Sequence, residues 1–240
     1  MTEIEKLKEL IDKSQSIVFF GGAGVSTESG IKDFRSQDGI YNMKFKHPPE
    51  VMLSHSFFYS NPEDFFEFYR NIMLCDGVLP NDAHKALAKL EEMGKLKAVI
   101  TQNIDGLHQM AGSKAVFELH GSVLRNYCDR CGKFFDVYYI RNSNGVPQCP
   151  CGGTVKPDVV LYEEMLDDKT VSGAVKAIEN ADLLIVAGTS LTVYPAAGLL
   201  RCFKGENLVL INRDATTYDE KADLIIREPV GKTLGKVVFG

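Results

Sequence analysis

The amino-acid sequence predicts an α/β fold built on a doubly wound parallel sheet, with a smaller second domain beside it. Short apolar runs recur along the 240-residue chain, and they are continuous rather than alternating, as in strands that helices cover on both faces. Segments with helical periodicity lie between many of these runs. Two stretches, 41–75 and 124–155, break the alternation and are predicted to form the smaller domain.

The elements of the larger domain can be justified in chain order. An amphipathic helix is expected after Thr2, which can form a capping box with Glu5. Further helices are expected over 81–94, where Asn81 suits the N-cap, and over 168–180. The predicted strands are 17–20, 98–100, 115–119, 183–187, 208–211 and 223–226.

The chain order also predicts the division into domains. The larger domain is expected to comprise 1–35, 84–123 and 155–240. Residues 36–83 form an aromatic-rich helical insertion, in which Pro62 suits a first helical position. Residues 124–154 form a second insertion, which holds four of the six cysteines. The two insertions together are predicted to form the small domain.

Composition excludes several classes of function. The formal net charge is −5 and no basic block occurs, so a nucleic-acid partner is not expected. No apolar run approaches the roughly 18 residues of a membrane span, and no secretory signal precedes the first apolar run. We therefore expect a cytoplasmic protein whose cysteines are thiols or metal ligands rather than disulfides. Cys75 and Cys202 lack evident partners and are predicted to be buried thiols.

Polar residues follow five of the predicted strands at the point where each strand ends. Carboxyl ends of parallel strands meet at one edge of a sheet, which is where open α/β sheets bind ligands. Amides are costly to bury without partners, so these residues are expected to line a binding site. They lie in the segments 21–24, 101–103, 120–121, 188–190 and at Asn212.

The first of these segments indicates phosphate binding. A glycine loop between a strand and an expected helix start aims backbone N–H groups and a helix dipole at an anion. The dehydrogenase fingerprint is incomplete, because Thr27 stands where its third glycine would lie. A dinucleotide is therefore expected, whereas hydride transfer is poorly supported.

Longer motifs give a more specific indication. GAGVSTESGIKDFRS (22–36), TQNIDGLH (101–108), ELHG (118–121), GTSLTVYPAAGL (188–199) and the cysteine segment occur in this order. Together they resemble the sirtuin family of NAD-dependent protein-lysine deacylases, in its bacterial type. The resemblance covers essentially the whole chain. It implies a Rossmann-like domain with a smaller zinc-binding and helical domain, and transfer of an acyl group from lysine to ADP-ribose with release of nicotinamide.

The resemblance also implies roles for individual residues. His120 would be the general base, and Asn103 and Asp105 would hold the nicotinamide carboxamide and ribose. Phe34 would shield the reactive ribose from water, and Arg35 would contact phosphate or ribose. The remaining cofactor-binding candidates are Gly22, Ala23, Gly24, Thr27, Asp33, Gln102, Ile104, Gly188, Thr189, Ser190, Asn212 and Val230.

The four cysteines of the second insertion are typical of structural zinc. Cys128 and Cys131 have zinc-knuckle spacing, and Cys149 and Cys151 supply a second pair, so four thiolates would saturate a tetrahedral ion. The second pair is C-x-C, where the sirtuin family usually shows C-x-x-C. A metal-free turn is the alternative.

The substrate side departs from the family in two places. KPDVVLYEE (156–164) resembles the segment that pairs with the substrate backbone, so Val160 and Tyr162 would border the acyl-lysine of a protein or peptide. Here Tyr-Glu-Glu replaces the common Phe-Gly-Glu, which could favour basic peptides or narrow access. Ile72 stands where succinyl-specific relatives carry arginine, so acetyl is expected over succinyl. An ADP-ribosyltransferase or NAD hydrolase, and a catalytically silent NAD-sensing module, are the alternative functions.

Overall fold

The computed structural model describes residues 1–36 and 39–240. Its larger sheet has six parallel strands in the order β3-β2-β1-β7-β8-β9. Counted within this sheet alone, that is the 3-2-1-4-5-6 order of dinucleotide-binding folds, which confirms the predicted doubly wound sheet. The bounds are β1 Ile17–Gly21, β2 Leu96–Thr101, β3 Val116–Glu118, β7 Leu183–Ala187, β8 Asn207–Ile211 and β9 Leu224–Ile226.

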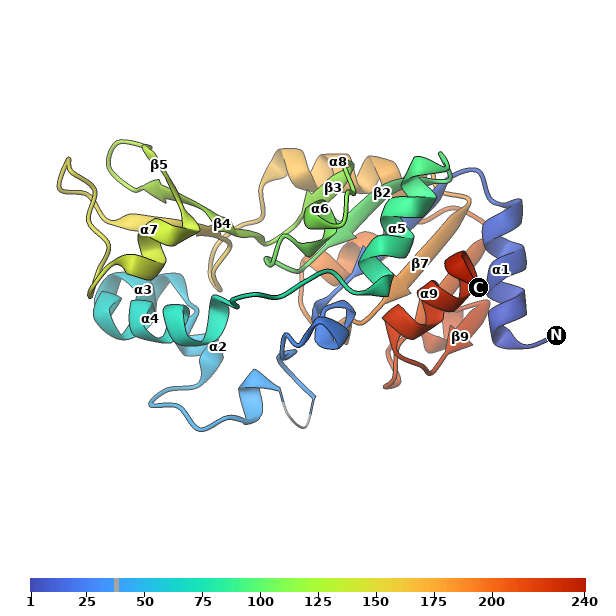
Figure 1. Ribbon diagram of the computed structural model, residues 1–240, viewed down its shortest axis with the longest axis horizontal. Helices are drawn as coiled ribbons and strands as arrows, with labels where there is room; N and C mark the ends of the chain where they lie inside the picture. Colours follow the sequence, from blue (N-terminus) through green and yellow to red (C-terminus); the bar gives the residue numbers. More distant parts are fainter. Residues whose placement is uncertain (37–38) are drawn as a thin grey trace.

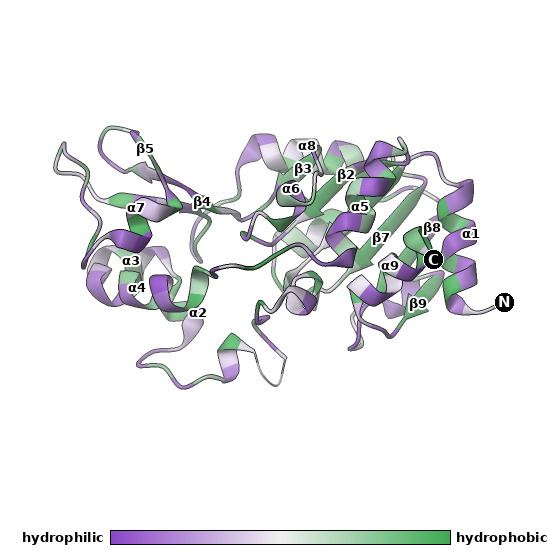
Figure 2. Ribbon diagram, in the orientation of Figure 1, coloured by the Kyte–Doolittle hydropathy of each residue, from purple (hydrophilic) through white to green (hydrophobic). Residues whose placement is uncertain are grey.

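Helices cover both faces of this sheet (Figure 1). One apolar core joins the sheet to α1 (Glu3–Lys13), α5 (Asp82–Glu92) and α9 (Val230–Phe239). A second core, on the other face, joins it to α8 (Asp168–Glu179) and the 3₁₀-helix η5 (Ala196–Cys202). Figure 2 shows the apolar strands between helices whose outer faces are polar, as the continuous apolar runs predicted.

The predicted helix caps are present. Thr2 Oγ1 accepts a hydrogen bond from the Glu5 amide (3.2 Å), and the Glu5 carboxylate accepts one from the Thr2 amide (2.7 Å). Asn81 Oδ1 accepts from the Ala83 amide at the start of α5. These bonds satisfy N–H groups that the first helical turn leaves free.

The smaller part of the chain has its own sheet and its own core. Strand β4 (Gly121–Cys128) pairs antiparallel with β5 (Phe134–Asp136) and with β6 (Val155–Val159). The helical insertion is broken into short pieces, α2 (Pro49–Met52), α3 (His55–Ser60), α4 (Pro62–Phe68) and the π-helix η4 (Tyr69–Met73). Their aromatic side chains pack with α7 (Val137–Asn142) and with Cys128 and Cys149. We call this part the small module.

The two insertions therefore lie side by side, at the end of the molecule opposite both termini (Figure 1). The predicted boundaries between the domains stay a proposal. The boundary at 35/36 lies between η2 (Thr27–Ser29) and η3 (Ile40–Asn42), the one at 83/84 within α5, the one at 123/124 within β4 and the one at 154/155 just before β6. The remaining short elements are η1 (Ala23–Val25), α6 (Leu107–Met110) and η6 (Asp219–Lys221). None of the helices in the described ranges has the length and apolar character needed to span a bilayer.

Candidate active site and cysteine cluster

A cleft of about 1150 Å³ lies between the large sheet and the small module. It is at the carboxyl ends of β1, β2, β7 and β8, the edge that the polar strand ends predicted. Every predicted site residue other than the cysteines lines it. They are Gly22, Ala23, Gly24, Thr27, Asp33, Phe34, Arg35, Gln102, Asn103, Ile104, Asp105, His120, Val160, Tyr162, Gly188, Thr189, Ser190, Asn212 and Val230.

The glycine loop after β1 packs backbone against backbone with the loop after β7. The Gly24 amide donates to the Gly188 carbonyl (2.8 Å), and a Cβ on Gly24 would lie 2.7 Å from the Gly188 Cα. Gly188 itself has φ +58°, and a Cβ there would lie 2.5 Å from the Val25 nitrogen. Side chains at either position would force the loops apart, so the two glycines hold a shallow backbone surface open to a ligand.

The helix expected after this loop does not form. Two 3₁₀ turns, η1 and η2, take its place, and the second ends at Gly30, whose φ is +92°. Such short turns carry little macrodipole, so the anion-binding capacity of the loop rests on local N–H groups rather than on an α-helix.

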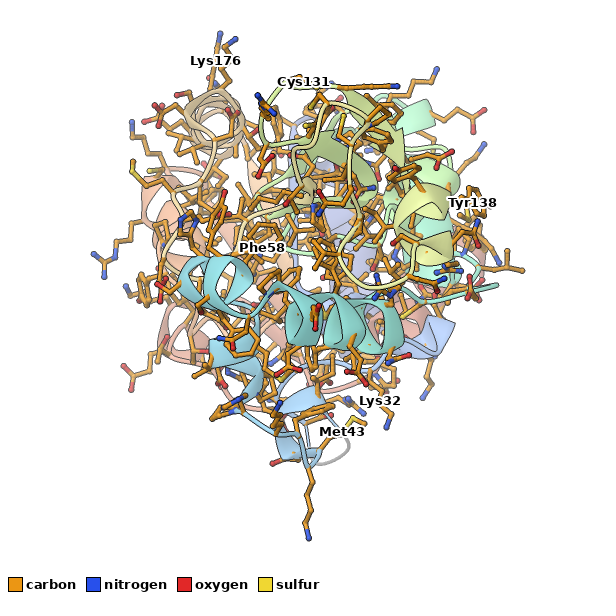
Figure 3. The ribbon with its side chains drawn as sticks, turned by 90° about the vertical axis from the view of Figure 1, so that its left-hand side faces the viewer. Lys32, Met43, Phe58, Cys131, Tyr138 and Lys176 are labelled. Carbon is orange, nitrogen blue, oxygen red and sulfur yellow. The ribbon has the colours of Figure 1, made fainter. Side chains whose placement is uncertain are left out.

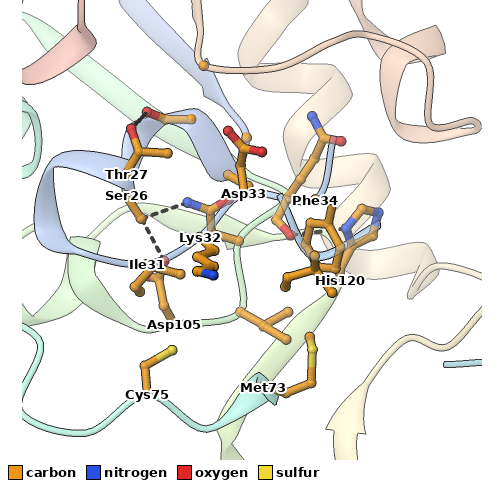
Figure 4. A pocket seen from close by; sticks show the side chains of 18 of the residues that line it. Ser26, Thr27, Ile31, Lys32, Asp33, Phe34, Met73, Cys75, Asp105 and His120 are labelled. Atoms are coloured by element: carbon orange, nitrogen blue, oxygen red, sulfur yellow. Dashed lines mark hydrogen bonds between the residues drawn. The ribbon is translucent and has the colours of Figure 1, made fainter. Parts of the chain in front are cut away.

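The amide cluster after β2 is held by a buried serine (Figure 4). Asn103 Nδ2 donates to Ser26 Oγ (3.0 Å), and Ser26 Oγ donates to Asp105 Oδ2 (2.7 Å). Asp105 Oδ1 also accepts from the Leu107 amide (2.9 Å). Asn103 and Ser26 are buried, so this chain of bonds fixes both polar groups at the floor of the cleft.

His120 follows β3 and is oriented by one backbone bond. Its Nδ1 lies 3.0 Å from the Gln102 carbonyl oxygen. Because a carbonyl only accepts, the hydrogen lies on Nδ1, and Nε2 keeps its lone pair. Burial lowers the pKa of His120 below its usual 6.5, against the opposing effect of the bond to Gln102. The imidazole is therefore neutral at pH 7, as a general base requires.

Further lining of the cleft comes from the loops after β2, β7 and β8. Gln102 Nε2 donates to Thr189 Oγ1 (3.0 Å), which joins two of these loops. The Asp33 carboxylate accepts hydrogen bonds from the amides of Arg35 and Ser36. These bonds stabilise the turn over residues 33–36, which borders the cleft.

The predicted substrate segment is fixed by both parts of the molecule. The Val160 amide donates to the His120 carbonyl (3.0 Å), and the Tyr162 amide donates to the Leu53 carbonyl (2.9 Å). These two amides are therefore engaged within the chain and are not available to pair with a peptide, which limits the strand addition expected from the resemblance. The side chains of Val160 and Tyr162 still line the cleft.

The acidic pair after Tyr162 lies at the cleft lining, but both carboxylates are bonded within the chain. Glu163 accepts from the amide (2.9 Å) and hydroxyl (2.6 Å) of Ser56, and these bonds lower its pKa. Glu164 accepts from Lys156 Nζ (3.0 Å) and lies 2.9 Å from His55 Nδ1. Both carboxylates thus have partners on α3 or β6, so the expectation that they favour basic peptides loses its support.

Four cysteine sulfurs cluster at the outer edge of the small module, where Figure 3 labels Cys131. The Sγ atoms of Cys128, Cys131, Cys149 and Cys151 all lie within 4.8 Å of one another. The Cys128–Cys151 and Cys131–Cys149 pairs are 3.4 and 3.7 Å apart. A tetrahedral zinc with Zn–S bonds of about 2.3 Å separates its sulfurs by roughly 3.8 Å, so the cluster fits this ion despite its C-x-C pair.

The two other cysteines correct a prediction. Cys75 is exposed and Cys202 is half-buried, so neither is the buried thiol that was expected. Cys75 lies in the extended connection between η4 and α5, which borders the cleft and has no core of its own. Sequence reasoning also missed Ser26 and Tyr41 as cleft residues.

The comparisons with known proteins decide the family. The model of the Sir2 family matches residues 22–195. The chain belongs to the Sir2 family. It is 61% identical to an NAD-dependent protein deacetylase of Clostridium acetobutylicum, with 99% of each chain covered. It is 63% identical to one of Clostridium perfringens, with 98% of each covered.

Solved Sir2 structures share the whole fold. A complex of Sir2 with a p53 peptide and NAD⁺ is 41% identical, with a TM-score of 0.86, and the match covers 99% of this chain and 97% of that one. A Sir2 complex with a deacetylated p53 peptide and 3′-O-acetyl ADP ribose is 40% identical, with a TM-score of 0.90 and coverage of 98% and 97%. The Rossmann-like sheet with its small cysteine-bearing module is therefore the Sir2 fold.

Proposed function

We propose that this Sir2 protein is an NAD-dependent protein-lysine deacetylase, which transfers the acyl group of lysine to ADP-ribose and releases nicotinamide. The observation that carries this proposal is the convergence, in one cleft, of the Gly24–Gly188 backbone surface, the Ser26–Asn103–Asp105 cluster and the neutral His120. The similar Clostridium proteins carry the same activity in their names.

The cleft offers a fitting surface for each part of NAD. The backbone around Ala23 and Gly24 would take the pyrophosphate, since no side chain obstructs it. The loops after β7 and β8, with Thr189 and Asn212, would take the adenosine half. NAD supplies the ribose carbon to which the acyl oxygen bonds as nicotinamide departs.

The nicotinamide half would lie over the amide cluster. Asn103 and Asp105 are immobilised by Ser26, so they present donors and acceptors to the carboxamide and ribose without further ordering. His120 Nε2 would remove a proton from a ribose hydroxyl. Phe34 lines the same cleft and would exclude water that otherwise hydrolyses NAD.

The acyl-lysine would enter beside Val160 and Tyr162. Ile72, Met73 and Ile104 add apolar groups to the lining of the cleft. Arg70 Nη1 donates to the Gly145 carbonyl (2.9 Å) and the Ser143 hydroxyl (3.3 Å), so its guanidinium is hydrogen-bonded within the small module. No cation of η4 is thus placed to receive a succinyl carboxylate, which favours acetyl and other apolar acyl groups.

Zinc bound by the four cysteines would be structural, because four thiolates leave no open coordination position. The expected partner is an acyl-lysine protein or peptide rather than a nucleic acid, in keeping with the net charge of −5. A cytoplasmic location is proposed with it, since these cysteines must stay reduced to hold zinc.

One product assay tests the function. Purified protein with NAD and an acetyl-lysine peptide should form O-acetyl-ADP-ribose and deacetylated peptide in equal amounts, detected by mass, and a succinyl peptide should react more slowly. ADP-ribose formed without peptide would indicate a hydrolase, ADP-ribosylated protein a transferase, and no product a silent NAD-binding module. His120→Ala should retain NAD binding and lose at least about 100-fold in deacetylation, whereas His47→Ala, outside the cleft, should not.

A further inference from the structure

The side chains of Tyr41 and Tyr162 meet across the mouth of the cleft. Their hydroxyl oxygens are 2.5 Å apart, although the residues are separated by 121 positions. Tyr41 belongs to η3, which follows the Asp33–Arg35 segment, whereas Tyr162 follows β6. The bond therefore joins the segment proposed to cover NAD to the segment proposed to border the acyl-lysine.

Tyr162 is the fixed member of this pair. Its amide donates to the Leu53 carbonyl, and its carbonyl accepts from the His55 amide, both at 2.9 Å. On its C-terminal side, Glu163 is bound by the amide and hydroxyl of Ser56. The backbone of Tyr162 is thus held on the small module from two directions.

Tyr41 is the member that contacts Phe34 and Arg35, the residues proposed to cover NAD. Its amide donates to the Phe34 carbonyl (2.9 Å), and its ring meets the Phe34 ring edge to face with centroids 5.6 Å apart. The Arg35 guanidinium lies 5.1 Å from the centre of the Tyr41 ring. Burial, with the bond to Tyr162, raises the pKa of Tyr41, so its hydroxyl keeps its proton at any physiological pH.

We propose that the Tyr41–Tyr162 hydrogen bond is a latch that positions Phe34 and Arg35 over the nicotinamide end of the cleft. Both tyrosines act through Phe34 and Arg35, so they are positioning residues. A phenylalanine in place of Tyr162 would keep the ring and remove only the hydroxyl that forms the bond. The latch rests on the proposed function for its effect on catalysis, but its effect on the segment can be measured without turnover.

The first test measures the segment itself. Hydrogen exchange of the Tyr41 amide should be about two- to tenfold faster in Tyr162→Phe, the factor expected for one net hydrogen bond. The Tyr41→Phe variant should show the same increase, and the double variant no further increase, because either change removes the whole bond. Tyr127→Phe is the matched control, and in this variant the Tyr41 amide should exchange at the wild-type rate. Tyr127 is exposed to nearly the same degree as Tyr162 (39% against 37%), but it lies on β4, outside the cleft lining.

The second test measures catalysis. Tyr162→Phe should raise the KM for NAD about two- to tenfold and increase the NAD hydrolysed per acetyl group transferred. Unchanged Tyr41 exchange in Tyr162→Phe, or additive effects in the double variant, would overturn the latch. If the wild type forms no O-acetyl-ADP-ribose while Tyr162→Phe still speeds exchange, the proposed function fails and the latch stands.

Discussion

Ser26 shows how one small side chain determines the geometry of the proposed active site. Its hydroxyl accepts from Asn103 and donates to Asp105, and it is fully buried. Removing it would leave the Asn103 amide without this partner and would free one carboxylate oxygen of Asp105. A hydrogen bond to a charged group contributes about 1.5–3 kcal/mol, so its loss should raise the free energy of the transition state by a similar amount.

Ser26→Ala is therefore expected to lower kcat/KM for NAD roughly 10- to 100-fold while the protein stays folded. Steady-state kinetics with an acetyl-lysine peptide would measure this. Ser16→Ala is the control, because Ser16 donates to the Asn180 carbonyl at the opposite end of β1. Equal kinetics for the Ser26 and Ser16 variants would mean that Asn103 and Asp105 hold their positions without the serine.

The role of Ser26 could not be predicted from its place in the sequence. Asn103 and Asp105 stood out because polar residues rarely follow an apolar strand without reason. A serine after a glycine loop is common, and only the approach of the β1 and β2 loops shows that its hydroxyl has two partners 77 and 79 positions away.

At the scale of elements, the strands of the large sheet were predictable and the small sheet was not. The strands of the large sheet are short apolar runs, and β1 and β7 are buried along their whole length. β4 mixes Arg125, Asn126 and Tyr127 with apolar residues, and its register with β6 shifts between Ser122 and Asn126. Such a strand is stabilised by partners far along the chain, and no local sequence pattern predicts it.

The cysteine cluster predicts that the small module depends on zinc for its stability. Two of its cysteines, Cys128 and Cys149, pack into the same core as the aromatic helices, so zinc binding should contribute to the folding of the whole module. Cys131→Ser should reduce zinc from about one ion per chain to near zero and lower the free energy of unfolding by several kcal/mol. Metal analysis and urea unfolding would measure these effects. Cys202→Ser, on η5, should keep its zinc, and full zinc in the Cys131 variant would contradict a four-thiolate site.

At the scale of the whole molecule, the strand order places β1 beside β7, where the direction of winding reverses. Ligands bind at this switch point, and the glycine loops after these two strands meet there. The sequence predicted the site because polar strand ends in a parallel sheet must share an edge. It did not predict how the insertions fold over that edge, since this depends on contacts such as those of Leu53 with Tyr162.

Two buried histidines behind the site predict how the whole fold responds to acid. His84 on α5 and His108 on α6 are almost fully buried, with ring centroids 4.7 Å apart. Neither ring nitrogen of His108 has a partner among the described residues. Burial lowers the pKa of His84 to about 4, against the opposing effect of the Asp105 charge. Burial, together with the neighbouring His84, lowers the pKa of His108 to about 3.

The sign of the effect follows from proton binding. In the unfolded chain both histidines titrate near 6.5, so below this pH the unfolded state binds more protons than the folded state. The free energy of unfolding should therefore fall as the pH decreases from 6.5 to 5, by up to about 1.4 kcal/mol per pH unit for each histidine. Well above pH 6.5, where the histidines are neutral in both states, this contribution is constant.

Urea unfolding across this range would measure the slope, and His108→Phe should reduce it by up to about 1.4 kcal/mol per pH unit, whatever its effect on absolute stability. His47→Phe should leave the slope as in the wild type, because His47 lies outside the buried pair. An unchanged slope in the His108 variant would show that the acid sensitivity arises elsewhere in the fold.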